Sequence, residues 1–99
     1  MYRLPVEDII YISSHGKKTV VHTEDREYEL SVLMKHIMKK LPASIFYRIH
    51  KRFAANKAYI SHVRYYLGGR YLLYLKNKEE DILPIGITYI KALKAKLGI

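Results

Sequence analysis

Short apolar runs that alternate with turn residues constrain the fold of this chain more than any other feature. Residues 9–12 form one such run before the polar and glycine residues at 13–16, and the β-branched run at 19–23 ends before Glu24 and Asp25. Runs of this kind are typical of β-strands. No apolar stretch approaches the roughly 20 residues of a membrane-spanning helix, and no apolar signal segment follows the first residue. We therefore expect a mostly β fold and no membrane partner.

A segment with helical spacing interrupts the strands. Alternating polarity predicts a third strand at 27–30, but between residues 30 and 41 apolar side chains recur every three or four positions. Ser31 precedes this segment and Pro42 ends it, which predicts one short inserted helix with Ser31 as its N-cap. The remaining expected elements are a strand at 45–50, a bend at 54–57, strands at 59–67 and 70–75 around a Gly68-Gly69 hairpin turn, an edge strand at 82–85 that contains Pro84, and a C-terminal helix that opens at 86–88.

Length and composition favour one domain. The chain has 99 residues, 49% of them hydrophobic, which is enough for a single core. We predict one domain over residues 1–99 and no second domain. The absence of cysteine excludes a disulfide scaffold and a thiolate metal site.

The charge is strongly positive and unevenly distributed. Lys and Arg number 18 against 9 Asp and Glu, which gives a net charge of +9. No acidic residue occurs between positions 30 and 78, whereas that segment contains Lys35, Lys39, Lys40, Arg48, Lys51, Arg52, Lys57, Arg64, Arg70, Lys76 and Lys78. Such clustering is typical of phosphate binding. A solvated basic face, or a protein-interaction module that meets an acidic partner, remains open at this point.

Catalytic and metal patterns are missing from the sequence. The 5 histidines show no metal-ligand spacing, and the serines lie in no nucleophile-elbow context. A two-metal nuclease site needs carboxylates that the middle of the chain lacks. We expect no enzyme, no metal and no cofactor.

Four tyrosines on adjacent expected strands offer an alternative function. Exposed rings at Tyr65, Tyr66, Tyr71 and Tyr74 would stack the bases of RNA or single-stranded DNA. Strand alternation instead directs about half of them inward, which favours core packing with the hydroxyl groups at the rim.

The segment from residue 46 to 56 is the most distinctive part of the chain. Alternation places Phe46 and Ile49 in apolar surroundings and leaves Arg48 and His50 on a common face, before Lys51 and Arg52 begin a bend. A solvated strand end explains this cationic cluster as well as a phosphate contact does. His50 has an ordinary pKa close to neutrality, so it can carry charge beside phosphate. The Asn56 amide can tie the following loop to the backbone.

Here the sequence resembles the LytTR family of bacterial DNA-binding domains, over about residues 4–97. The resemblance rests on the segment 6–12, on Phe-Tyr-Arg-Ile-His at 46–50 followed by Phe53 and Ala55-Asn56, on Ile60, and on Pro-Ile-Gly at 84–86. It implies stacked antiparallel sheets of about ten short strands, with one inserted short helix and one C-terminal helix.

The resemblance also implies sequence-specific binding of double-stranded DNA in transcription regulation. Domains of this family usually follow a receiver domain in the response regulators of two-component systems, which are cytoplasmic and answer to a sensor kinase. We expect repeated half-sites and a possible homodimer on DNA.

Three loops hold the base-reading positions that the resemblance implies. The first has Lys17 and Lys18, the second has Lys51 with Arg52 beside it, and the third has Ile87 where the family often has arginine. Thr88 replaces this third contact, or Ile87 touches a thymine methyl group. Besides these base-reading positions, we expect a set of phosphate-binding residues, which comprises Arg48, His50, Arg52 and, more weakly, Arg70.

Overall fold

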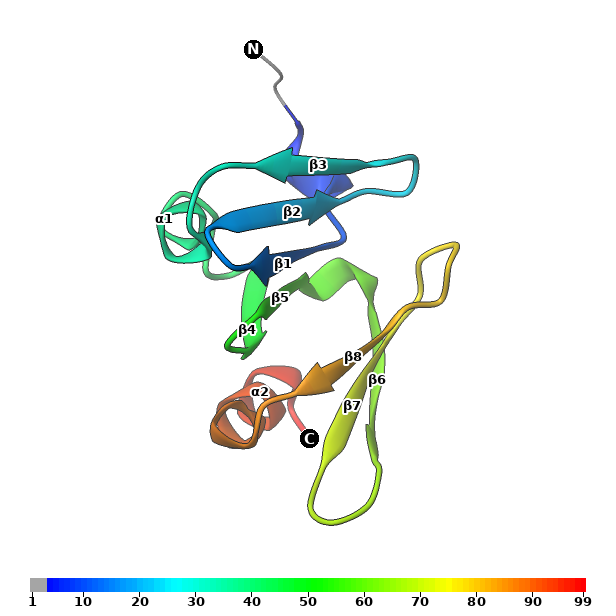
Figure 1. The fold of residues 1–99 in the computed structure, drawn as a ribbon. Helices are drawn as coiled ribbons and strands as arrows, with labels where there is room; N and C mark the ends of the chain where they lie inside the picture. The colour runs from blue at the N-terminus through cyan, green and yellow to red at the C-terminus, as the bar shows by residue number, and fades with distance from the viewer. Residues whose placement is uncertain (1–3) are drawn as a thin grey trace.

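Antiparallel strand pairing organises the chain into two sheets, as the computed structural model shows for residues 4–99 (Figure 1). The five-stranded sheet has the order β3-β2-β1-β5-β4, and the three-stranded sheet has the order β6-β7-β8. The strands are β1 (Tyr11–His15), β2 (Lys18–His22), β3 (Glu27–Leu30), β4 (Phe46–His50), β5 (Phe53–Asn56), β6 (Ile60–Tyr65), β7 (Tyr71–Leu75) and β8 (Ile82–Ile85). The helices are α1 (Met34–Met38) and α2 (Ile90–Leu97), with short 3-10 helices η1 (Val6–Asp8), η2 (Lys57–Tyr59) and η3 (Ile87–Tyr89).

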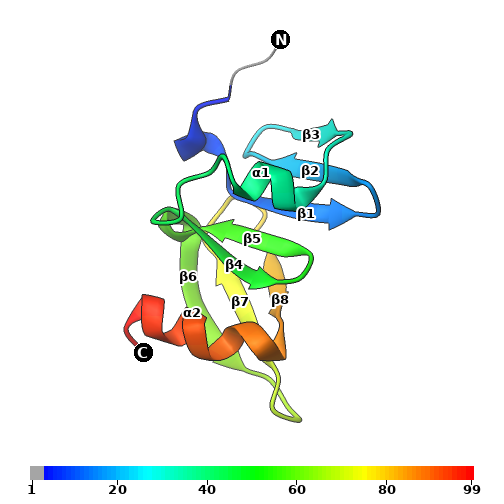
Figure 2. The ribbon, with the colours of Figure 1, turned by 90° about the vertical axis from the view of Figure 1, so that its left-hand side faces the viewer.

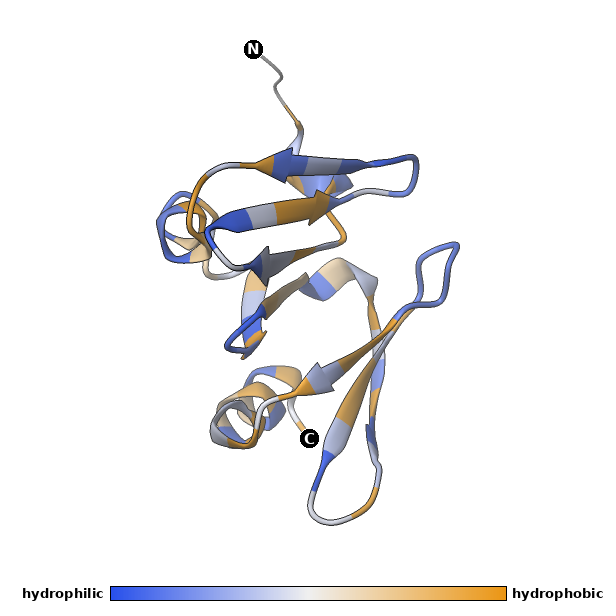
Figure 3. Cartoon of the chain, viewed as in Figure 1, coloured by the Kyte–Doolittle hydropathy of each residue, from blue (hydrophilic) through white to orange (hydrophobic). Residues whose placement is uncertain are grey.

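Strands β1 and β5, in the inner part of the five-stranded sheet, are buried on both faces. Ile12 and Ala54 face a core cluster that includes Met34 of α1, while Tyr11 and Ala55 face a second cluster shared with the other sheet and with Leu93 of α2. Adjacent residues of β1 and β5 point to opposite faces because strand side chains alternate. Hydrophilic residues line the β2–β3 and β7–β8 turns, whereas hydrophobic residues recur along the strands (Figure 3).

The mostly β fold class, the inserted helix and the terminal helix are confirmed. The strand predicted at 27–30 is β3, Gly68 and Gly69 lie in the turn between β6 and β7, and Pro84 lies in the edge strand β8. Residues 4–99 contain eight strands, fewer than the ten or so that the family resemblance implied.

Two expected loops are strands. The sequence predicts a turn at residues 13–16, but Ser13 and Ser14 extend β1 because they pair with Val20 and Thr19 of β2. The turn comes later, at Gly16, which has a φ of 65° that favours glycine. The bend predicted at 54–57 is instead mostly β5, because two fully buried alanines let this strand pass between the two core clusters. Tertiary packing overrides the weak strand propensity of alanine here.

The inserted helix is shorter than its spacing predicts. Leu30 pairs with Thr19 as the last residue of β3, and the Thr19 hydroxyl donates to the carbonyl of Val32 at 2.7 Å. These contacts keep the chain extended, so α1 begins only at Met34 and its N-cap is Leu33 rather than Ser31.

Two features are absent from residues 4–99, a membrane-spanning helix and a cluster of metal-binding side chains. Neither helix there is long and apolar enough to cross a membrane. No three His, Asp or Glu side chains in that part of the chain are placed to hold a metal ion.

Candidate nucleic-acid interface

Three loops meet along one edge of the molecule, at the right of Figure 2. They are the β1–β2 turn, the β4–β5 turn and η3. The first two are joined because the Ser14 amide donates to the carbonyl of Arg52 at 2.9 Å. The third is joined to β4 because the Gly86 amide donates to the carbonyl of Ile49 at 2.8 Å. The fold thus brings the three sequence-predicted base-reading loops together.

Arg48 braces the β4–β5 turn from the strand side. Its Nε donates to the carbonyl of His50 at 2.8 Å, and its Nη2 donates to the carbonyl of Lys51. The pairing register of β4 with β5 shifts between Arg48 and His50, so the strict alternation predicted there is broken. Sequence reasoning missed this bracing role, because alternation alone does not reveal a side chain that bends back to its own turn. Phosphate binding by Arg48 stays a prediction.

The turn that Arg48 braces presents two unengaged cations. Lys51 and Arg52 are exposed, and neither side chain makes a hydrogen bond or ion pair with any other residue in the described part of the chain. Their positive charges are therefore available to an anionic partner at no cost in internal contacts.

In the domain without DNA, the surroundings of His50 favour its neutral form, and a charged His50 beside phosphate stays a prediction. Its Nδ1 accepts a hydrogen bond from the Arg52 amide at 3.1 Å. Partial burial, followed by the charges of Lys51, Arg52 and Arg48, lowers the pKa of His50 below its ordinary value. With Nδ1 occupied as an acceptor, neutral His50 carries its proton on Nε2 and offers a donor there.

The β1–β2 turn presents its two lysines differently. Lys17 is exposed, with no side-chain partner among residues 4–99. Lys18 instead forms an ion pair with Glu29 across β2 and β3 at 2.8 Å, and the hydrogen bond and charge of Glu29 raise the pKa of Lys18. Exposed pairs of this kind are weak, so Lys18 can exchange Glu29 for another anion.

Gly86 allows η3 to lie against the end of β4. A Cβ atom at this position would lie 2.9 Å from Cδ2 of Tyr89 and 3.5 Å from the Cα of His50. The close approach carries Ile87 and Thr88 to the shared edge, where Ile87 is 76% exposed and Thr88 is also exposed. Sequence reasoning identified the Pro-Ile-Gly segment but not this steric reason for its glycine.

The four tyrosines do not form one free stacking surface. Tyr65 and Tyr66 are exposed near the β6–β7 hairpin tip, beside the exposed Arg70. The hydroxyl of Tyr71 instead accepts a hydrogen bond from Lys94 at 3.0 Å, and Tyr74 stacks on His62 with ring centroids 4.6 Å apart. Tyr65 and Tyr71 pair across β6 and β7 with their rings edge to face 5.4 Å apart, so they share one face of the sheet, whereas Tyr74 lies on the other face.

Asn56 is buried at the opposite end of β5 from the β4–β5 turn. Its Nδ2 donates to the carbonyl of Ile9 and its Oδ1 accepts from the Ala58 amide, both at 2.9 Å. The side chain therefore holds η2 and the chain before β1 together, at a distance from the three loops.

Comparison with known proteins decides the family. The model of the LytTr DNA-binding domain family matches residues 1–98 of the chain. The chain belongs to the LytTR family. As a LytTR domain it is a DNA-binding domain of the kind found in transcriptional regulators, and neither catalysis nor tyrosine-based RNA binding is favoured.

Relatives of this LytTR domain are longer proteins. It is 36% identical over 93 residues to the sensory transduction protein LytT of Bacillus subtilis, covering 94% of this chain and 38% of the relative. It is 29% identical to the transcriptional regulatory protein YpdB of Escherichia coli, covering 91% of this chain and 36% of that protein. It is 27% identical to the transcriptional regulatory protein LytR of Staphylococcus aureus, covering the whole chain and 39% of that protein.

A solved structure has the same fold as this LytTR domain. A LytTr DNA-binding domain from Bacillus cereus superposes with a TM-score of 0.86 at 22% identity, covering 97% of this chain and 86% of the other. The resemblance inferred from the sequence is therefore confirmed in family and in fold.

Proposed function

We propose that this LytTR domain reads double-stranded DNA sequence-specifically, with the β1–β2 turn, the β4–β5 turn and η3 as its contact loops. The observation that carries the proposal is the single edge on which these loops meet, with unengaged cations on two of them. Loops aligned in this way can enter successive major grooves while the backbone between them is gripped.

We assign the side chains of these loops to two roles, contact with base edges and contact with phosphates. Lys17 and Lys51 reach base edges, most favourably O6 and N7 of guanine, and Lys18 joins them when it leaves Glu29. Arg52, Arg70 and the Nε2–H of His50 hold phosphates, as do the guanidinium donors of Arg48 that its turn leaves unused. In the third loop, Thr88 or Ile87 makes the contact, with Ile87 suited to a thymine methyl group.

Charge separation along the domain supports this orientation. The β2–β3 turn holds Glu24 and Asp25, and Glu24 accepts a hydrogen bond from the Lys78 amide in the β7–β8 turn at 3.0 Å. Both turns lie at the end of the sheets opposite the β1–β2 turn (Figure 1). Because DNA is negatively charged, it repels this acidic end and attracts the cationic edge, which orients the domain with its three loops toward the duplex.

The greater length of the relatives supports a proposal about the larger protein to which this domain belongs. Because the chain spans only 36% to 39% of these three relatives, we propose that it works as the output domain of a cytoplasmic response regulator, with a receiver domain and a sensor kinase as partners. We also propose that residues 1–99 act as one domain on one half-site, because one core cluster joins both sheets. Two copies would then occupy repeated half-sites as a homodimer on DNA.

Lys51→Ala tests the assignment of base reading. We expect a loss of about 1–3 kcal/mol on a selected duplex and a smaller loss on random duplex, because a base contact is lost. Lys57→Ala removes the same charge from the far end of β5 and should leave discrimination unchanged. Equal losses on both duplexes would contradict the role of Lys51. Competition by single-stranded DNA as effective as by duplex would contradict the proposed function itself.

A further inference from the structure

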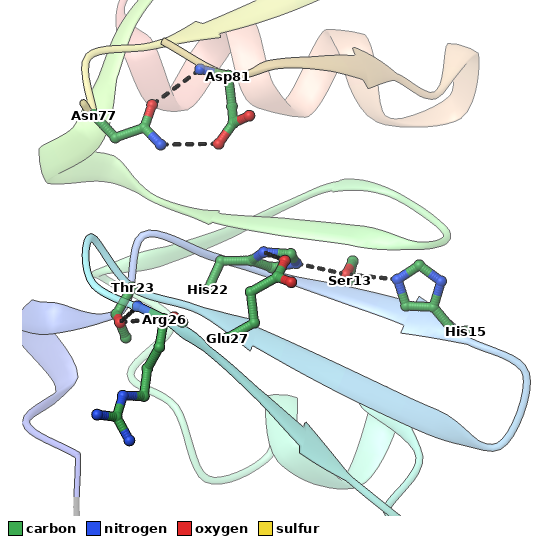
Figure 4. A network of polar contacts seen from close by, with 8 residues as sticks. All are labelled: Ser13, His15, His22, Thr23, Arg26, Glu27, Asn77 and Asp81. Atoms are coloured by element: carbon green, nitrogen blue, oxygen red, sulfur yellow. Dashed lines mark hydrogen bonds and ion pairs between the residues drawn. The ribbon is translucent and has the colours of Figure 1, made fainter. Parts of the chain in front are cut away.

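A line of polar side chains crosses the five-stranded sheet and ends at the β1–β2 turn (Figure 4). Glu27 of β3 contacts Nδ1 of His22 at 2.8 Å. Nε2 of His22 contacts the hydroxyl of Ser13 at 2.9 Å, and the same hydroxyl contacts Nε2 of His15 at 2.9 Å. Ser13 is only 2% exposed, so its hydroxyl depends on these two imidazoles for hydrogen bonding.

The chemistry of these groups sets the direction of each hydrogen bond. Burial is the largest influence on His22 and lowers its pKa, so its ring is neutral at neutral pH. A carboxylate only accepts, so the single ring proton of His22 lies on Nδ1 and points to Glu27. Nε2 of His22 must then accept from the Ser13 hydroxyl, which leaves that oxygen able only to accept. His15 therefore donates from Nε2.

Other titratable groups influence His22, and burial remains the largest influence on its pKa. Tyr11 stacks on its ring with centroids 3.9 Å apart, and burial raises the pKa of Tyr11 to about 12, so the phenol stays protonated. Asp81, from the turn before β8, and Glu27 both favour a charged His22, while burial and His15 oppose it.

These hydrogen-bond directions leave His15, beside the β1–β2 turn, with a free acceptor. With its proton on Nε2, the neutral form of His15 has a lone pair on Nδ1, and no residue in the described part of the chain hydrogen-bonds to that atom. His15 is exposed, ends β1 and stands two residues before Lys17. Lysine and arginine side chains only donate, so they cannot read the amino groups that adenine and cytosine present in the major groove.

We propose that His15 is a base-reading residue that accepts a hydrogen bond at Nδ1 from the exocyclic amino group of adenine or cytosine. Glu27, His22 and Ser13 are positioning residues that hold His15 in the required tautomer. The inference rests on the proposed function, and it adds an acceptor to an interface otherwise made of donors.

The ring nitrogen signals of the free domain test the positioning step without DNA. Nitrogen-15 NMR at about pH 7.5 should show the proton of His22 on Nδ1 and that of His15 on Nε2. Ser13→Ala should leave His22 unchanged and give His15 a mixture of tautomers. Ser14→Ala, at the next position of the same strand, is the matched control and should change neither ring. A His15 proton on Nδ1 in the wild type would overturn the proposal.

Duplex binding tests the reading step. Selection with the wild type and with His15→Ala should differ at one position, where only the wild type prefers adenine or cytosine. If that base is adenine, replacing it with purine, which lacks the amino group, should weaken the wild type about five-fold, the effect of one hydrogen bond. For cytosine, the matched probe is a pyrimidine without the 4-amino group. Either probe should leave His15→Ala unaffected. Stronger binding through His15 at about pH 5.5 would indicate a phosphate contact and overturn the proposal.

Comparison with Lys51→Ala distinguishes a wrong role for His15 from a wrong proposed function. If Lys51→Ala relaxes the selected sequence while His15→Ala leaves it intact, the proposed function stands and the role of His15 is wrong. If the wild type selects no sequence, the proposed function is wrong and the role of His15 falls with it.

Discussion

At the scale of single residues, Arg48 connects the strand β4 to the turn that presents Lys51. The two carbonyl contacts need the planar guanidinium fork, which an ammonium group does not reproduce. A phosphate contact through charge alone would tolerate lysine at this position.

Arg48→Lys separates these two roles. We expect it to lower the free energy of unfolding by about 1 kcal/mol, a modest value for a partly exposed charged donor. We also expect it to reduce discrimination between selected and random duplex nearly as much as Arg48→Ala does. Urea unfolding and duplex titration measure the two effects. Wild-type discrimination in Arg48→Lys would show that Arg48 acts only through its charge.

The neutral state of His50 makes stability depend on pH. Its pKa is lowered in the folded domain from an ordinary value of 6.5, so the unfolded chain binds a proton first as the pH falls. The contribution of His50 is fully present above about pH 6.5 and is lost as the pH falls through the folded pKa.

We expect the free energy of unfolding to fall as the pH is lowered from about 7.5 to about 5, and to fall less steeply in His50→Gln. Urea unfolding at several pH values measures this. His22 acts in the same direction, so some slope remains in the variant. A slope of opposite sign, or one that His50→Gln leaves unchanged, would contradict the burial of neutral His50.

The sequence predicts the cationic residues of the proposed interface but not their internal partners. Lys17, Lys51 and Arg52 are readable from the family pattern, because exposed charges in turns need no tertiary information. The pairing of Lys18 with Glu29 depends on the register of β2 with β3, and the neutral His50 depends on how the turn folds back. Neither is encoded in local spacing.

At the scale of elements, the prediction succeeds where local signals act alone. The two-glycine turn between β6 and β7 and the strand that contains Pro84 need only local backbone preferences. It is wrong where long-range pairing decides. Ser13 is held in β1 by two neighbouring strands, and Ala54 is held in β5 by buried positions on both faces of the sheet.

Gly86 gives the clearest prediction about an element, because it sets the distance between η3 and β4. Gly86→Ala should lower the free energy of unfolding by about 1–2 kcal/mol, since the new methyl group overlaps the Tyr89 ring. It should also weaken selected-duplex binding by displacing Ile87 and Thr88. Both quantities are measured by urea unfolding and duplex titration.

A double-mutant cycle with Tyr89→Ala provides the control. If the overlap with the ring is the cause, Gly86→Ala should cost less in the Tyr89→Ala background than in the wild type. Additive effects of the two substitutions would contradict the steric explanation.

At the scale of the whole molecule, a net charge of +9 leads us to expect a strong electrostatic contribution to DNA binding. If about six phosphates are neutralised, the logarithm of the binding constant should fall against the logarithm of salt concentration with a slope of about −5. Arg52→Ala should reduce that slope by about one. Lys57→Ala should not change it, because Lys57 lies away from the edge. A salt-independent complex would exclude phosphate binding.

Selection from a random duplex library at roughly physiological salt tests the central claim most directly. We expect enrichment of a short motif, repeated one or two helical turns apart, because we propose that one domain covers one half-site. Binding that is weak, salt-sensitive and without any enriched motif would contradict sequence-specific reading by the three loops.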